Sequence, residues 1–224
     1  KYCDIILVGD SMANVLYGLE STHQISLKTI IRHTQSVKQG IKNSLLVVDM
    51  PKDSYTNTKL AKKNAKLILK NTGCDAVKLE NDGKNHKIIS ELVKAKIPVM
   101  GHIGYTPQFK KKFKVEGRTK NKFLKLLRDA LLIEKAGAFS IVLECITPKA
   151  SSLITKKLKI PTIGIGSSSF CDGQILVTDD MLGLSGFYPK FVKKYLSMNT
   201  IIEKAVKKYT REVRLKKFPT KKNF

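Results

Sequence analysis

The sequence predicts an α/β fold of the (β/α)8, or TIM-barrel, class. Short apolar runs alternate with longer amphipathic segments, as in strands and helices that are joined by right-handed crossovers. Most of the short runs are continuously apolar, which is typical of parallel strands that are buried on both faces. The length of 224 residues, without an internal repeat or a linker, favours one large domain.

Seven segments have the length and apolar content of buried strands, one fewer than a closed (β/α)8 barrel contains. Most of them are rich in Val, Ile and Leu, and amphipathic segments lie between several of them. The predicted strands are Asp4–Gly9, Ser44–Val48, Ala76–Leu79, Pro98–Gly101, Phe139–Leu143, Pro161–Ile165 and Gln174–Val177.

Three segments between these strands have the apolar spacing of amphipathic helices: Thr58–Asn71, His86–Lys96 and Asn121–Ala136. Gly73 and Gly137 follow the first and third of them, where a glycine favours the end of a helix. We therefore expect these segments to form crossover helices of the barrel.

The end of the chain differs from the rest in composition. Residues 207–224 are dense in Lys and Arg, poor in apolar residues, and contain Pro219. We expect a barrel domain over residues 1–206 and, over residues 207–224, a basic tail that begins as a surface helix and frays into a mobile end.

The chain is strongly basic, with 42 Lys and Arg residues against 18 Asp and Glu residues, a formal net charge of +24. Such a field attracts polyanions. Before residue 207, however, the lysines are spread along the chain without a basic helix or interleaved aromatic residues. We therefore do not expect a specific nucleic-acid partner.

The apolar and cysteine patterns indicate a cytoplasmic protein. No run of about 18 apolar residues is present, so no membrane-spanning helix is expected. Asp10 interrupts the first apolar stretch, which argues against a signal peptide. The four cysteines form no CxxC pair and no zinc-type cluster with histidine, so free thiols in a reducing compartment are expected.

Ionisable side chains follow five consecutive predicted strands. In a parallel barrel the carboxyl ends of all strands lie on one face, where the active site of this fold is built. These residues are therefore expected to converge, although they are far apart in sequence. In chain order they are Asp10 with the neighbouring hydroxyl of Ser11, Asp49, Lys78 with Glu80, His102, and Glu144.

Each of these residues alone has a simpler interpretation. An aspartate after a strand is more often a turn former or a helix cap. Lys78 and Glu80 could form an ordinary ion pair, and His102 could be a hydrogen-bonded core histidine. That interpretation would scatter ionisable groups over both ends of the strands, whereas five strands here deliver them to one end. A shared site is therefore favoured.

The three carboxylates Asp10, Asp49 and Glu80 predict a site for a hard cation. Oxygen ligands that leave room for water and substrate suit Mg²⁺ better than zinc. A metal beside Lys78 points to a substrate with a carboxylate and a ketone, whose enolate the cation would stabilise. Glu144 is then available for proton transfer.

Ten segments occur in an order that is typical of one family. They are DIILVGDS, TIIRHTQSV, LLVVDMP, NAKLILKNTGCDAVKLE, IPVMGHIGYTPQ, VEGR, DALLIEKAGAFSIVLE, IPTIGIG, CDGQILV and PKFVKKY. Through them the chain closely resembles the ketopantoate hydroxymethyltransferase (3-methyl-2-oxobutanoate hydroxymethyltransferase) family. The GHIG-TPQ and CDGQ-LV motifs are the most specific.

The resemblance implies a (β/α)8 barrel that transfers a hydroxymethyl group from 5,10-methylenetetrahydrofolate to 3-methyl-2-oxobutanoate. The product would be 2-dehydropantoate, in the first step of pantothenate biosynthesis. The resemblance also implies Mg²⁺ as the cofactor, the 2-oxo acid and the folate as small-molecule partners, and a homo-oligomer, commonly a decamer.

The same resemblance implies roles for the clustered residues. Asp10 and Asp49 would hold Mg²⁺, with Glu80 near the ion or bound to it through water. Glu144 would be the catalytic base that removes the proton beside the ketone.

The resemblance also implies the substrate contacts. Ser11 and Lys78 would bind the carboxylate and carbonyl of the 2-oxo acid, with Asp49 beside them. His102 would line the pocket and contact substrate or product.

The chain departs from the family pattern in three places. Relatives begin with a further strand and helix that carry a T-A-Y-D-like motif, so the first βα unit is expected to be absent here. That absence would account for the missing eighth strand. Ser168 stands where a glycine is usual, and Asn81 with Asp82 stand where relatives often have two glycines.

Two other functions stay open. A Mg²⁺-dependent lyase or mutase on another 2-oxo acid would use the same groups, because fold does not fix function. Dependence on folate would separate it from the transferase. A truncated, inactive barrel whose basic surface binds an acidic partner is the other alternative, and the intact carboxylate set argues against it.

Overall fold

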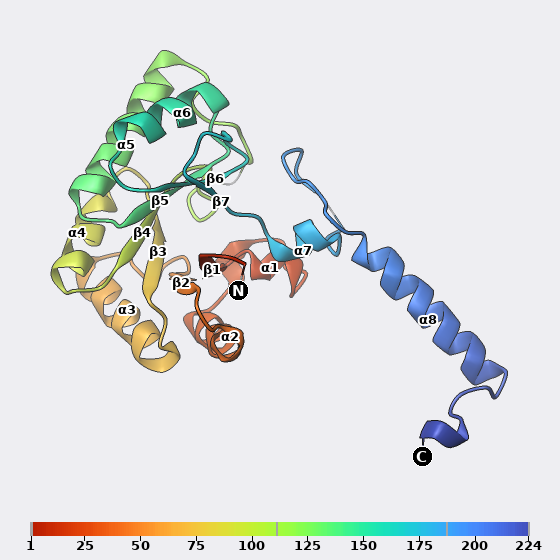
Figure 1. The fold of residues 1–224 in the computed structure, drawn as a ribbon. Helices are drawn as coiled ribbons and strands as arrows, with labels where there is room; N and C mark the ends of the chain where they lie inside the picture. The colour runs from red at the N-terminus through yellow and green to blue at the C-terminus, as the bar shows by residue number, and fades with distance from the viewer. Residues whose placement is uncertain (1, 111, 187, 224) are drawn as a thin grey trace. The chain divides into compact units, whose positions relative to one another are not determined.

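The computed structural model describes residues 2–110, 112–186 and 188–223, and the chain folds as two compact units (Figure 1). The first unit is Lys1–Ile175 and the second is Leu176–Phe224. The first unit contains the whole sheet and every residue that the sequence predicted for the site. The domain limits predicted from the sequence, 1–206 and 207–224, stay a prediction.

The first unit is built on a curled, wholly parallel sheet whose seven strands follow one another in chain order (Figure 1). This confirms the α/β class and the parallel sheet that the sequence predicted. The strands are β1 (Ile5–Val8), β2 (Leu45–Asp49), β3 (Ala76–Glu80), β4 (Val99–Gly104), β5 (Ser140–Glu144), β6 (Thr162–Ile165) and β7 (Gly173–Gln174).

Two strand predictions need correction. The strand predicted over Gln174–Val177 is wrong for its last three residues, because β7 ends at Gln174 after two residues. The strand predicted to end at Gly101 continues to Gly104, so His102 lies within β4 instead of after it. In β4 the apolar run gives way to polar and glycine residues while the pairing with β5 continues as far as Gly104 and Glu144.

The helices of the first unit run between consecutive strands, and Figure 1 shows α3 to α6 along the outside of the sheet. Local signals explain their limits. The Asn57 side chain accepts a hydrogen bond from Leu60 N at the start of α3, and Gly73 ends it in the left-handed conformation (φ 61°). The helices are α1 (Met12–Val15), α2 (Leu27–Gly40), α3 (Thr58–Thr72), α4 (His86–Lys94), α5 (Lys120–Lys135) and α6 (Pro148–Lys157), with a 3-10 turn η1 (Thr22–Gln24).

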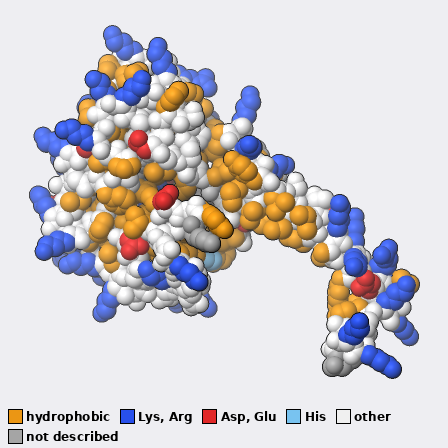
Figure 2. Space-filling view, viewed as in Figure 1, with side chains coloured by type: hydrophobic (Ala, Val, Ile, Leu, Met, Phe, Trp, Pro, Cys, Tyr) orange, Lys and Arg blue, Asp and Glu red, His pale blue; other side chains and the backbone are white. Residues whose placement is uncertain are grey.

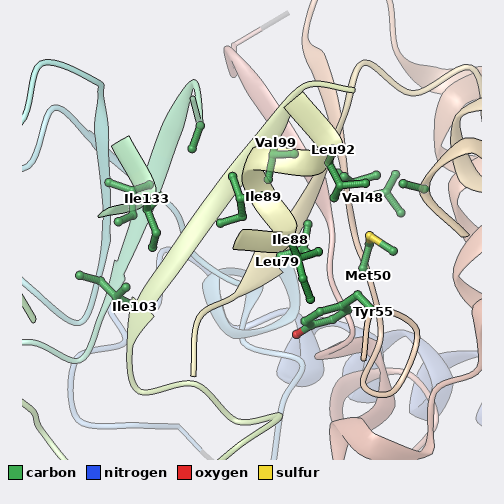
Figure 3. Close-up of a cluster of buried hydrophobic side chains, with 14 of the residues drawn as sticks. Val48, Met50, Tyr55, Leu79, Ile88, Ile89, Leu92, Val99, Ile103 and Ile133 are labelled. Carbon is green, nitrogen blue, oxygen red and sulfur yellow. The ribbon is translucent and has the colours of Figure 1, made fainter. Parts of the chain in front are cut away.

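The two faces of the sheet carry different residues, because successive side chains of a strand point to opposite faces. The face toward the helices is part of the main apolar core, to which Val48, Leu79, Val99, Ile103 and Ile133 belong (Figure 3). The opposite, inner face has a smaller apolar cluster at the amino ends of the strands, formed by Val47, Ala76, Met100 and Val142. The ionisable residues follow this cluster toward the carboxyl ends.

The second unit contains α7 (Thr178–Leu182), α8 (Met198–Arg214) and a 3-10 turn η2 (Lys221–Asn223). The helix predicted in the basic tail exists, but it begins at Met198, before the Lys-rich segment. Its apolar residues recur at helical spacing and include Ile202, Val206 and Tyr209, all exposed. That spacing, and not the Lys content, marks where the helix starts.

Basic side chains are more prominent than acidic ones on the face of the molecule seen in Figure 2. Lys and Arg are distributed widely over this face, and acidic side chains are few (Figure 2). Among the described residues, no helix combines the length and the apolar character needed to span a membrane.

Candidate active site

The inner face of the sheet brings the predicted site residues side by side at the carboxyl ends of the strands. The parallel register pairs Asp49 of β2 with Lys78 of β3, and Glu80 of β3 with His102 of β4. Glu144 ends β5 opposite Gly104. The convergence that the sequence predicted for these groups is therefore present in the fold.

Asp10 and Ser11 join this group where the chain leaves β1. The backbone N–H of Asp10 donates to Oδ2 of Asp49 over 3.1 Å. Gly9 makes this approach possible, because a Cβ at that position would lie 3.3 Å from Asp49 Oδ2 and 3.1 Å from Ser11 Oγ. Ser11 precedes α1, but its side chain makes no capping hydrogen bond, so its hydroxyl is not committed to the helix.

Lys78 and Asp49 form a buried ion pair. The Lys78 ammonium donates to Oδ1 of Asp49, and both side chains are almost completely excluded from solvent. Burial by itself lowers the pKa of Lys78, but the charges of Asp49, Glu80 and Asp10 outweigh burial and raise it above its ordinary value. Lys78 is therefore a fixed positive charge in the site.

The carboxylates outnumber the cationic groups around Lys78. Burial, followed by the charge of Asp49, raises the pKa of Asp10 to about 7. Burial also raises the pKa of Glu80 well above its ordinary value, against the lowering effect of Lys78. Burial is the larger cause of both shifts, and one buried ammonium group, that of Lys78, faces the three carboxylates Asp10, Asp49 and Glu80.

His102 lies between Glu80 and Glu144. Its Nε2 is 3.1 Å from Glu144 Oε2 and its Nδ1 is 3.7 Å from Glu80 Oε1, but neither contact has hydrogen-bond geometry. Burial and the charge of Lys78 lower the pKa of His102, which favours the neutral imidazole. A buried histidine without a satisfied ring nitrogen is unusual away from functional sites.

Glu144 differs from the other carboxylates in its accessibility. Its side chain is 20% exposed, whereas those of Asp49, Glu80 and His102 are 5% exposed or less. Glu144 is thus the carboxylate of this cluster that a substrate reaches most directly, at the position where the sequence predicted a proton-transfer group.

Two further residues of the site, Gln108 and Tyr55, were not predicted from the sequence as site residues. Gln108 is 2% exposed, and its side-chain amide donates to Asp10 Oδ2 over 2.9 Å. The Tyr55 hydroxyl donates to Gln108 Oε1. Gln108 ends the TPQ motif, so the sequence contained a signal, but its partners are far from it in the chain and only the fold identifies them.

The residues present fit a divalent cation with few protein ligands. Within the described ranges, no three His, Cys, Asp or Glu side chains are arranged as a ready-made metal site. Asp10 and Asp49 nevertheless lie next to each other in a buried place that is short of positive charge. Two carboxylates with positions left for substrate and water match the way proteins hold Mg²⁺.

A parallel α/β sheet with buried acid, lysine and histidine side chains at its carboxyl edge has the architecture of an enzyme. The chain belongs to the ketopantoate hydroxymethyltransferase family, whose model matches residues 1–221.

Relatives with high identity carry one name, 3-methyl-2-oxobutanoate hydroxymethyltransferase. The protein of Pelagibacter ubique is 49% identical over 223 residues, which cover 100% of this chain and 87% of that protein. The protein of Clostridioides difficile is 48% identical over 99% of this chain and 83% of its own length. That of Anaplasma marginale is 47% identical over 98% and 80%.

Solved structures support the fold at much lower identity. A phosphoenolpyruvate phosphomutase from Streptomyces platensis matches with a TM-score of 0.55 at 14% identity, over 96% of this chain and 76% of that one. A 2,3-dimethylmalate lyase of the PEP mutase/isocitrate lyase superfamily matches with a TM-score of 0.54 at 11% identity, over 71% of this chain. The match spans only 58% of the lyase chain.

Proposed function

We propose that this protein transfers a hydroxymethyl group from 5,10-methylenetetrahydrofolate to 3-methyl-2-oxobutanoate and so forms 2-dehydropantoate, the first step of pantothenate biosynthesis. Family membership over residues 1–221 supports this proposal, together with relatives of that name at 47–49% identity. The single structural observation that supports it most is the contrast between accessible Glu144 and the buried charges beside it.

Glu144 is proposed as the base that removes the proton from C3 of the 2-oxo acid. Its carboxylate is the accessible one of the cluster, and His102 Nε2 lies 3.1 Å away. A neutral His102 has one N–H and no hydrogen-bond partner among the described residues, so it can donate to a substrate oxygen beside Glu144.

Lys78 and Ser11 are proposed to bind the carboxylate and carbonyl of the 2-oxo acid. Lys78 is held as a cation by Asp49, and a fixed charge stabilises an oxyanion without having to reorganise. The Ser11 hydroxyl lies next to Gly9 on the same side as Asp49. The ketone would therefore meet a positive charge and a hydroxyl donor from two strands.

Asp10 and Asp49 are proposed as the Mg²⁺ ligands, with Glu80 placed behind them. Mg²⁺, when bound, supplies the Lewis acid that polarises the ketone and balances the negative charge of the enolate. Glu80 accepts a hydrogen bond from Gln108 N over 3.0 Å, and the Gln108 side chain donates to Asp10, so that one residue links Glu80 to Asp10. This arrangement supports the prediction that Glu80 acts near the ion or through water.

The proposed reaction balances in simple terms. Glu144 takes the C3 proton, and C3 forms a bond to the one-carbon unit carried by the folate. Both bonds from that carbon to the folate nitrogens break, and the hydroxyl of one water adds to the carbon. The C3 proton and the remaining water proton go to the two nitrogens, so that tetrahydrofolate leaves.

Three further proposals accompany this function. We infer that the curled sheet is part of a closed (β/α)8 barrel, supported by the likeness to solved structures with TM-scores above 0.5. A cytoplasmic location is supported by the four free cysteines. Homo-oligomeric assembly, by family resemblance a decamer, rests on the family alone, and light scattering would measure it.

The test is product formation by the protein with 3-methyl-2-oxobutanoate, 5,10-methylenetetrahydrofolate and Mg²⁺. We expect 2-dehydropantoate to form, and we expect Asp49→Ala and Glu144→Ala to remove most of the turnover. General acid–base groups contribute about 10² to 10⁴ in rate. A protein that binds both substrates and makes no 2-dehydropantoate would refute the proposal, and turnover of a 2-oxo acid without folate would favour a lyase.

A further inference from the structure

Gln108 has every polar group of its side chain occupied by a residue of the candidate site. Its Nε2 donates to Asp10 Oδ2 over 2.9 Å and to the carbonyl oxygen of Met50 over 3.0 Å. Its Oε1 accepts from the hydroxyl of Tyr55. A glutamine amide has two N–H donors and one carbonyl acceptor, so this side chain is fully used.

The backbone of Gln108 adds a second link to the site. Its N–H donates to Oε2 of Glu80 over 3.0 Å. Gln108, in the loop between β4 and α5, therefore contacts two carboxylates: Asp10, which follows β1, and Glu80, which ends β3. These two carboxylates are 70 positions apart in sequence and share no direct hydrogen bond among those of the described residues.

The acceptors Asp10 and Met50 fix which way the amide of Gln108 points, and Tyr55 holds its oxygen. The ring of Tyr55 is a buried member of the main apolar core, and Figure 3 shows it at the edge of that cluster beside Met50. If the amide turned over, its oxygen would face the carboxylate of Asp10 and the carbonyl of Met50, both acceptors, and its NH₂ would face the Tyr55 hydroxyl. Two donor–acceptor pairs would be lost, so the observed orientation is strongly favoured.

The bond from Gln108 engages only one oxygen of Asp10. Oδ2 is held by the amide, while Asp49 is held through both of its oxygens, by Asp10 N and by Lys78. Among the hydrogen bonds of the described residues, the one from Gln108 is the only one that the Asp10 carboxylate accepts. With Oδ2 fixed, Oδ1 keeps one direction and stays available as a ligand.

We propose that Gln108, anchored by Tyr55, is the positioning residue of the cation site, because it holds the Asp10 carboxylate in the direction needed for a divalent ion and links Glu80 to it. This inference rests on the proposed Mg²⁺ site but adds residues that the family motifs leave without a role. Groups that orient metal ligands typically change metal affinity 10- to 100-fold when removed.

The test is Mn²⁺ binding, measured by electron paramagnetic resonance without substrates, so that it does not depend on turnover. We expect Gln108→Leu, which is similar in volume, to weaken Mn²⁺ binding about tenfold or more. Tyr55→Phe removes only the anchoring hydroxyl and should weaken binding less. The double variant should bind no more weakly than Gln108→Leu alone, because Tyr55 is proposed to act through Gln108.

Asn64→Leu is the matched control. Asn64 is also a buried amide, and its Nδ2 donates to the carbonyl oxygen of Ser54 over 2.7 Å and to no atom of Gln108 among the hydrogen bonds of the described residues. It should lower the melting temperature and leave Mn²⁺ affinity unchanged, which separates positioning from general stability.

Three results would overturn the inference. Equal Mn²⁺ affinity in Gln108→Leu and the unmodified protein would refute it while leaving the proposed function intact. Effects of Tyr55→Phe and Gln108→Leu that add in the double variant would show that Tyr55 acts separately. A protein that makes 2-dehydropantoate with Mg²⁺ but binds no Mn²⁺ would remove the cation site on which the inference depends.

Discussion

The outer and inner faces of the same strands show how one sheet serves both stability and chemistry. In β3, Val77 and Leu79 belong to the main apolar core on the helix side of the sheet. Lys78 and Glu80 alternate with them along the strand, so their side chains lie on the inner face. The two faces are equally buried, yet one holds hydrocarbon and the other holds charge. Burying charge is costly unless partners compensate it, so the inner face has to be explained by function.

The inner face itself changes character along the strands. At the amino ends it is filled by Val47, Ala76, Met100 and Val142. Toward the carboxyl ends it carries the ionisable residues, so that an apolar layer closes the bottom of the site. We therefore expect substitutions among the ionisable residues of the inner face to lower activity, and substitutions in the apolar core to lower stability without lowering kcat.

The largest effect should come from Lys78→Met, which removes the central cation of the inner face. Breaking a buried ion pair leaves Asp49 uncompensated and costs about 3–5 kcal/mol of folding free energy. Loss of one preorganised electrostatic group should also lower kcat about 10²- to 10³-fold. Urea unfolding and steady-state kinetics would measure the two effects.

Lys94→Met is the control for that variant. Lys94 forms an exposed ion pair with Glu91, and solvent screens such pairs so that they contribute little to stability. A similar loss in both lysine variants would contradict the special role of the inner face.

Ile133→Ala should show the opposite profile on the outer side of the sheet. Ile133 is fully buried in the main core and packs against Gly101, so the cavity should cost about 2–5 kcal/mol. Well below the melting temperature, kcat should not change, because Ile133 belongs to the main apolar core on the helix side of the sheet. If kcat fell as far as in Lys78→Met, the separation of the two faces would be wrong.

Gly9→Ala should affect activity with little cost in stability. The added Cβ would lie 3.1 Å from Ser11 Oγ and 3.3 Å from Asp49 Oδ2, so both side chains must shift. We expect the KM for the 2-oxo acid to rise while the melting temperature stays nearly constant. Gly40→Ala, at the end of α2 with open space around it, should leave KM unchanged.

The smallest effect concerns Asp129 of α5, whose pKa is raised by burial and whose Oδ1 has no hydrogen-bond partner among the described residues. Ionisation of this group opposes folding, so stability falls as pH rises through the raised pKa. Asp129→Asn should therefore have a higher melting temperature than the unmodified protein at pH 8. The difference should vanish below pH 3.8, the ordinary pKa of aspartate.

Glu91→Gln provides the opposite sign. Lys62 and Lys94 lower the pKa of Glu91 to about 2, so its ionised form favours folding above the ordinary pKa of 4.5. The variant should be slightly less stable at pH 8, and this loss should fade as the pH falls toward 2. Equal pH profiles for the two variants would contradict both assignments.

The sequence was sufficient to predict the parallel sheet and the group of residues at its carboxyl edge. Continuous apolar runs identified β1 to β6. Because parallel strands all run in the same direction, the residues at their carboxyl ends were placed at one edge of the sheet: Asp10, Asp49, Lys78, Glu80, His102 and Glu144. What it could not predict was which groups touch. The contacts of Gln108 with Tyr55 and Asp10 span 53 and 98 positions and depend on how a loop folds back.

Short and irregular elements were also beyond sequence patterns. β7 has two residues, too few for any periodicity, and three of the four residues predicted for it are outside a strand. Ser168, where the resemblance predicts a glycine, is buried, and its Oγ accepts a hydrogen bond from Phe170 N over 3.1 Å. The Ser168 side chain thus takes part in shaping that loop.

The central claim is that Glu144 on the inner face removes the C3 proton of 3-methyl-2-oxobutanoate. Hydrogen exchange at C3 tests it most directly, because this step can be measured without the folate. In D₂O with Mg²⁺ and no folate, proton NMR should show loss of the C3–H signal with the unmodified protein. Glu144→Gln should abolish this exchange and keep its melting temperature, since Glu144 is partly exposed. Exchange that continues at full rate in Glu144→Gln would contradict the account.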